Sequence, residues 1–162
     1  MPTFKPCFSI LPEGQRRLWS QLRKAADLGF VLYGGTAIAL RLGHRTSVDF
    51  DFFSEKTLDR DAINAAFPFM ARATSLVDRG DTWSVFVPCG NSERDSVHVS
   101  FLGGIGFGRV GQPDVSEDGV LDVALLSRQL TDELHATSSL VVPVSGLPGY
   151  RPRSRDALEE VA

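Results

Sequence analysis

Two aspartates one residue apart carry the strongest chemical signal in this 162-residue sequence. Asp49 and Asp51 lie in the segment Val48 to Phe53, VDFDFF, where apolar residues alternate with the carboxylates. This period-two alternation predicts a strand with Val48, Phe50 and Phe52 on one face and both carboxylates on the other. Like charges this close repel each other, so a hard divalent cation such as Mg²⁺ is the expected partner.

A glycine turn lies shortly before the two aspartates. The apolar run FVLY at residues 30–33 predicts a buried strand, and Gly34-Gly35 ends it in a tight turn. Thr36 is the expected N-cap of a short helix that ends at Gly43. Unsatisfied backbone N–H groups at a helix N-terminus favour an anion, which makes the turn a phosphate-binding candidate.

Each motif taken alone is more often structural than functional. Their order within one strand-turn-helix-strand unit favours metal-assisted phosphoryl or nucleotidyl transfer, in which carboxylates hold the metal and the turn holds phosphates. His44 and Arg45 lie between the two motifs. They are either a helix-end residue and a surface charge, or contacts for phosphate or base.

The residues of both motifs together resemble a known family. LYGGTAIAL at residues 32–40, followed by HRTSVDFDFF at residues 44–53, resembles the nucleotidyltransferase-fold toxins of the AbiEii/AbiGii type. These belong to the DNA polymerase β-like nucleotidyltransferase superfamily and are toxins of bacterial abortive-infection toxin–antitoxin pairs. The resemblance implies an α/β (α+β) fold with a small mixed sheet flanked by helices. It also implies transfer of a nucleotidyl group from a nucleoside triphosphate to an RNA or protein acceptor, and a cognate antitoxin as partner.

The resemblance also implies a role for each residue of the two motifs. The cofactor is expected to be Mg²⁺ or Mn²⁺, and the nucleoside triphosphate is the substrate. The metal-binding and catalytic residues are then Asp49 and Asp51, and the nucleotide-binding residues are Gly34, Gly35, Thr36, His44, Arg45 and Ser47.

Length and composition fit one globular domain. The chain has a 43% hydrophobic fraction and a net charge of −3, so a polynucleotide partner would need a local basic patch. No apolar run is long enough to span a bilayer and the N-terminus lacks a signal-peptide core, so a cytoplasmic protein without membrane contact is expected. Cys7 and Cys89 have no metal-type spacing and are expected to be free thiols.

The remaining pattern predicts the elements around the core. An amphipathic helix is expected within residues 11–30, with Gln15 on its polar face, and a second helix is capped near Thr57 and ends before Pro68. Strands are expected at residues 73–78, 82–87 and 96–102. We expect residues 1–126 to form the nucleotidyltransferase-like core and residues 127–162 a shortened or irregular C-terminal helix and tail, with the helix at 127–136.

Three departures from the family pattern keep other functions open. The strand at 96–102 has His98 and Ser100 where a third carboxylate is expected, and Glu133 stands where the family carries a nucleotide-binding lysine. The proline-rich tail fits a frameshifted remnant, because allowed codons for residues 146–151 can encode a family-like segment in the adjacent frame. The alternatives are a catalytically inactive nucleotide-binding module or truncated remnant, and an antitoxin-binding protein without catalysis.

Overall fold

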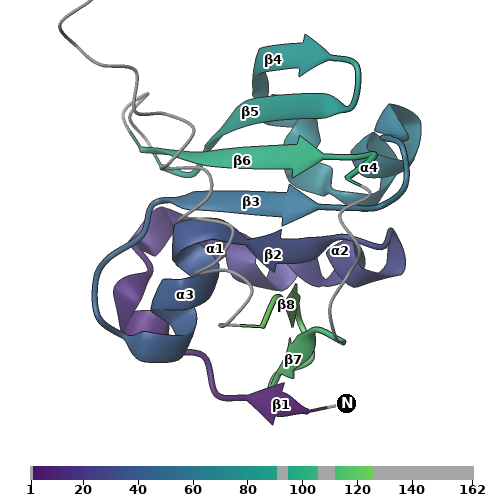
Figure 1. The fold of residues 1–162 in the computed structure, drawn as a ribbon. Coiled ribbons are helices and arrows are strands. Elements are labelled where there is room, and N and C mark those ends of the chain that lie inside the picture. Colours follow the sequence, from purple (N-terminus) through teal and green to yellow (C-terminus); the bar gives the residue numbers. More distant parts are fainter. Residues whose placement is uncertain (1, 91–94, 106–111, 126–162) are drawn as a thin grey trace, which may run out of the picture.

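A computed structural model describes residues 2–90, 95–105 and 112–125 of the chain (Figure 1). Within these residues one eight-stranded sheet has the strand order β1-β7-β8-β2-β3-β6-β5-β4. Its strands are β1 (Thr3–Phe4), β2 (Val31–Tyr33), β3 (Asp49–Phe53), β4 (Thr74–Arg79), β5 (Thr82–Pro88), β6 (Ser96–Leu102), β7 (Asp114–Ser116) and β8 (Asp122–Val123). The helices are η1 (Phe8–Ile10), α1 (Glu13–Trp19), η2 (Ser20–Arg23), α2 (Lys24–Asp27), α3 (Gly34–Leu42), α4 (Arg60–Ala66) and η3 (Pro68–Arg72).

The centre of the sheet is mixed, as the sequence predicted. β2 runs antiparallel to β3, β3 runs parallel to β6, and β4, β5 and β6 are antiparallel neighbours. The short strands β1, β7 and β8 extend the sheet beyond β2. β1 and β7 were not predicted, since two or three residues give no recognisable alternation. The expected helix at 127–136, the boundary after residue 126 and Glu133 lie outside the described residues.

Aromatic side chains form the core on one face of the sheet. Phe50 of β3 and Phe101 of β6 are fully buried. Trp19 at the end of α1 lies 6.4 Å from Phe50 between ring centroids, and Phe67, at the end of α4, lies 5.5 Å from Phe101. The helices α1, α2 and α4 therefore cover this face and lie behind the sheet in Figure 1. The carboxylates of β3 point from the opposite face.

The first amphipathic segment is not the one continuous helix that the sequence predicted. It is divided into α1, η2 and α2, with a 3-10 turn between the two short helices. Leu18, Leu22 and Ala25 are buried as expected, but Gln15 is also buried, at 1% exposure. The prediction of a polar face for Gln15 is wrong because its side-chain Nε2 donates to the backbone oxygen of Asp49 over 3.2 Å.

Two smaller expectations are also corrected. The cap of the second helix is Asp59 rather than Thr57, because the Asp59 carboxylate accepts from the backbone N–H of Ala62 at 2.9 Å. Val48 does not share the buried face of the strand: β3 begins at Asp49, and Val48 is 57% exposed.

Candidate active site

Asp49 and Asp51 lie on the same face of β3, as their spacing predicted. The Asp49 side chain is about half exposed and Asp51 is partly buried. Burial, and then the charge of Asp49, raise the pKa of Asp51, while a hydrogen bond from Ser100 and the nearby His98 act against this rise. The two carboxylates are thus an incompletely compensated pair of like charges.

The neighbouring strand β6 places an imidazole and a hydroxyl beside the carboxylates. In the parallel register His98 pairs with Asp49, and Ser100 pairs with Asp51. His98 Nδ1 lies 3.6 Å from Asp49 Oδ1, and the Ser84 hydroxyl of β5 donates to Ser100 Oγ over 3.2 Å. In the described part of the chain, no cluster of three or more His, Cys, Asp or Glu residues is arranged as a metal site.

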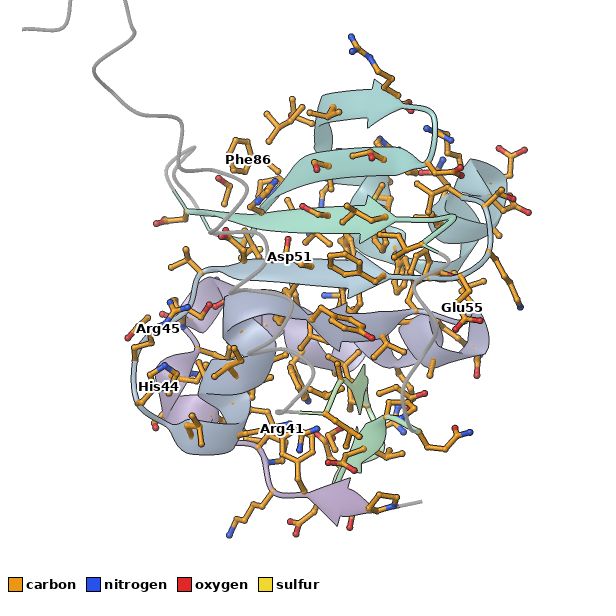
Figure 2. The ribbon with its side chains drawn as sticks, viewed as in Figure 1. Arg41, His44, Arg45, Asp51, Glu55 and Phe86 are labelled. Carbon is orange, nitrogen blue, oxygen red and sulfur yellow. The ribbon has the colours of Figure 1, made fainter. Side chains whose placement is uncertain are left out.

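The glycine turn brings the backbone against the carboxylates. Gly34 has φ = 71°, a left-handed conformation that favours glycine, and a Cβ on it would lie 2.9 Å from Asp51 Oδ2. A Cβ on Gly35 would collide with the guanidinium of Arg45. The turn, Asp51 and Arg45 are therefore close neighbours, and Figure 2 shows Arg45 and Asp51 on the same side of the molecule.

Thr36 is not the N-cap that the sequence predicted. Helix α3 begins at Gly34 after Tyr33, and no side chain caps it. The Thr36 hydroxyl donates instead to the backbone oxygen of Asp49 and lies 2.7 Å from the Ser47 hydroxyl, with both side chains buried. Since the single hydroxyl proton of Thr36 goes to Asp49, Ser47 is the donor to Thr36.

These bonds fix the start of the carboxylate strand from two sides. The Asp49 carbonyl accepts from Thr36 in α3 and from the buried Gln15 in α1. Thr36 and Ser47 use their hydroxyls inside the protein, so a nucleotide contact of Thr36 would come from its backbone. The role of Gln15 was not predicted, because a glutamine in an amphipathic segment indicates a solvent-facing position.

The two residues between the motifs differ in their surroundings. α3 ends at Gly43 with φ = 63°, as predicted, and His44 and Arg45 follow as exposed residues (Figure 2). Arg45 reaches back to the glycine turn. Among the interactions of the described residues, none joins His44 to Asp49 or Asp51.

A cavity of about 510 Å³ lies near the starts of β3 and β6, where residues of α1 meet these strands. Its lining includes Gln15, Arg17, Val48 and Cys89, but neither carboxylate. The candidate site is therefore the open carboxylate face rather than this cavity.

A crystal structure described as that of a "putative nucleotidyltransferase from H. pylori" shares this fold. It superposes with a TM-score of 0.57 at 18% identity, over 75% of this chain and 56% of that chain. The described chain thus has a nucleotidyltransferase-type mixed α/β fold.

The family follows from the sequence match. The model of the nucleotidyl transferase AbiEii toxin family, Type IV TA system, matches residues 17–119, which include both motifs. The chain belongs to this family. It is also 42% identical over 67 residues to the uncharacterized protein aq_aa25 of Aquifex aeolicus (strain VF5), covering 38% of this chain and 32% of that protein. The chain therefore matches about a third of that relative's length and just over half of the solved chain.

Proposed function

We propose that this chain is a metal-dependent nucleotidyltransferase and the toxin of a toxin–antitoxin pair. It would transfer a nucleotidyl group from a nucleoside triphosphate to an RNA or protein acceptor, and a cognate antitoxin would be its protein partner. The observation that carries the proposal is the meeting of the glycine turn, the Arg45 guanidinium and the Asp49–Asp51 pair on one face.

The carboxylate pair fits a hard divalent cation. Mg²⁺ is commonly held by one or two carboxylates together with the phosphates of its substrate, so a third protein ligand is not required. Burial and the adjacent Asp49 raise the pKa of Asp51, which means that its negative charge is unfavourable there. A bound cation would compensate this charge. When bound between Asp49 and Asp51, Mg²⁺ or Mn²⁺ would neutralise charge on the triphosphate.

The remaining residues would hold the triphosphate tail. Backbone N–H groups of Gly34, Gly35 and Thr36 would donate to phosphate oxygens, which the absence of side chains on the two glycines permits. The Arg45 guanidinium, beside Gly35, can donate two parallel hydrogen bonds to one phosphate. His44 and Ser47 are proposed to line the nucleotide pocket, Ser47 through the loop that its buried hydroxyl anchors.

The reaction is an in-line displacement at the α-phosphorus. A hydroxyl oxygen of the acceptor forms a bond to this phosphorus while the bond to the oxygen that bridges it to the β-phosphate breaks. Pyrophosphate leaves, and the hydroxyl proton passes to solvent. Asp49 and Asp51 would hold the cation, whose charge would offset that of the α-phosphate, and the turn and Arg45 would retain the departing pyrophosphate.

Transfer of label from each α-³²P nucleoside triphosphate to total RNA and total protein tests the proposal. The reaction is run with Mg²⁺ or Mn²⁺ on the parent chain, on Asp49→Asn and Asp51→Asn, and on Asp27→Asn as a matched surface control. Asp27 lies on α2, behind the sheet, and pairs only with Lys24 among the described ion pairs. The function is supported if label transfer requires the metal and both Asp49 and Asp51, and if Asp27→Asn transfers label as the parent chain does.

A second candidate function is a catalytically inactive nucleotide-binding module. The observation in its favour is that His98 and Ser100 occupy the strand positions where the fold commonly supplies a third carboxylate. Metal-dependent thermal stabilisation by nucleoside triphosphates without any transfer of label would select this candidate. A folded chain that binds no nucleotide but binds its antitoxin would instead be an interaction protein.

A further inference from the structure

The carboxylate face continues across β6 onto β5 as a row of three side chains. Asp49 pairs with His98, and His98 pairs with Phe86 in the antiparallel register. The Phe86 and His98 rings are 5.5 Å apart between centroids at 57°. Phe86 is 40% exposed, although large apolar side chains are usually buried. Figure 2 shows Phe86 on the same side of the sheet as Asp51.

This row lies on the opposite side of the carboxylates from the glycine turn. In the strand order, β2 and the turn that follows it are on one side of β3, and β6 and β5 are on the other. In an in-line displacement the attacking and leaving oxygens lie on opposite sides of the phosphorus. If pyrophosphate leaves toward the turn and Arg45, the acceptor must approach over His98 and Phe86.

We propose that Phe86 is the acceptor platform, on which a planar ring of the acceptor stacks while its hydroxyl reaches the carboxylates. This inference rests on the proposed function, and it assigns a specificity role to a residue outside the two motifs. His98, between Phe86 and Asp49, forms the wall along which the acceptor lies.

The spacing of the row favours a nucleobase over a protein side chain. Phe86 is two strand spacings from Asp49, which is roughly 10 Å. A serine acceptor has no ring, and a tyrosine hydroxyl at the carboxylates would leave its ring over His98. A terminal nucleotide has its base separated from the reacting hydroxyl by a sugar, so the base can reach Phe86. Base–aromatic stacking tolerates any base, because each has a π-face.

Binding of two RNA oligomers tests the platform separately from turnover. The oligomers are identical except that one ends in an abasic residue, and binding is measured by fluorescence anisotropy with Mn²⁺ and a non-hydrolysable triphosphate. For the normal oligomer, Phe86→Ala should raise the Kd roughly 10- to 100-fold, the range for loss of one stacking platform. Phe86→Trp should restore binding. Leu76→Ala, at another exposed apolar residue of the sheet, should leave the Kd unchanged.

The abasic oligomer provides the decisive comparison. Its Kd should be high with the parent chain and should not rise further with Phe86→Ala. Equal binding of the normal oligomer by the parent chain and Phe86→Ala would overturn the inference, as would label transfer to protein at an unchanged rate in Phe86→Ala. Metal-dependent stabilisation by the triphosphate is measured on the same samples. If the triphosphate stabilises the parent chain but Phe86→Ala has no effect on RNA binding, only the platform is overturned. If the triphosphate does not stabilise the parent chain, the proposed function is overturned as well.

Discussion

At the scale of single residues, the negative charge of Asp51 lowers the stability of the folded chain, although the proposed metal site needs that charge. Burial and the adjacent Asp49 raise the pKa of Asp51, so the folded chain holds its proton more tightly than the unfolded chain does. The contribution of this group to stability is therefore full at low pH and is lost as the pH rises through the raised pKa. Ionised Asp51 lowers the stability of the metal-free protein at neutral pH.

Asp51→Asn should therefore raise the Tm at pH 7 in the presence of a chelator while removing metal-dependent transfer. The gain should shrink as the pH falls toward 3.8, the ordinary pKa of an aspartate. Thermal unfolding as a function of pH measures both effects, with Asp27→Asn as the surface control. A lower Tm for Asp51→Asn at pH 7 without metal would contradict this description of the pair.

Gly35 and Arg45 make a second prediction about single residues. Gly35→Ala should leave the fold intact, because the side chain that must move is the flexible Arg45, and triphosphate binding should weaken about 10- to 100-fold as charge-assisted hydrogen bonds are lost. Arg45→Lys is the matched comparison: it keeps the charge without the planar fork, so its loss should be smaller. Calorimetric titration with metal and triphosphate measures both. An unchanged triphosphate affinity in Gly35→Ala would show that Arg45 does not contribute to the site.

At the scale of elements, Thr36 ties α3 and the loop that follows it to the carboxylate strand. Thr36→Val keeps the shape of the side chain but leaves the Asp49 carbonyl without one donor and the Ser47 hydroxyl without its acceptor. We expect a loss of about 1–3 kcal/mol in the free energy of unfolding, measured with urea. Ser47→Ala removes one of these bonds only and should cost less. A larger loss for Ser47→Ala than for Thr36→Val would contradict this assignment, in which Ser47 donates to Thr36 and Thr36 donates to Asp49.

Asp118 joins α1 to the β7–β8 end of the sheet. Its carboxylate accepts from the Trp19 indole at 2.6 Å and from the Ser116 hydroxyl at 2.7 Å. Burial alone would raise the pKa of Asp118, but these bonds, a bond from the Val120 N–H and the charge of Arg23 outweigh it and lower the pKa. The ionised group therefore adds stability above its ordinary value of 3.8, and this is lost as the pH falls through the lowered pKa.

Asp118→Asn should accordingly lower the Tm at pH 7, and the difference from the parent chain should vanish in strong acid. Thermal unfolding from pH 7 down to about pH 2 checks the sign. Asp27→Asn, at an exposed carboxylate of α2, is the control. A difference in Tm that grows on acidification would show that Asp118 is not held in its charged form.

Local patterns predicted the central elements well, and long-range contacts account for the failures. The residue pattern predicted the strands β3, β5 and β6, and alternation in β3 correctly placed Phe50 and Phe52 on the buried face and Asp49 and Asp51 on the other. The same alternation in TWSVFVP places Ser84 and Phe86 on one face. The burial of Gln15 and the hydrogen bond of the Thr36 hydroxyl both depend on the backbone oxygen of Asp49. Local sequence patterns cannot predict contacts with a residue this far along the chain.

At the scale of the whole molecule, the family and the mixed sheet agree with the resemblance that the two motifs suggested. The family match spans residues 17–119, so it includes the turn, the carboxylate strand and the partner strand β6. The sheet also has an edge that no sequence pattern predicted, where β1 pairs in parallel with β7. In the described ranges no helix combines the length and the apolar character needed to cross a membrane.

The position of the label tests the central claim, nucleotidyl rather than phosphoryl transfer, most directly. Parallel reactions with α-³²P and γ-³²P forms of one nucleoside triphosphate, on the parent chain and on Asp49→Asn, follow each phosphorus to its product. The site described here predicts that the α-label becomes covalently attached to the acceptor and that the γ-label is released as pyrophosphate, both only with metal and with Asp49 intact. Attachment of the γ-label to the acceptor would contradict it, because the phosphates at the turn would then be transferred rather than released.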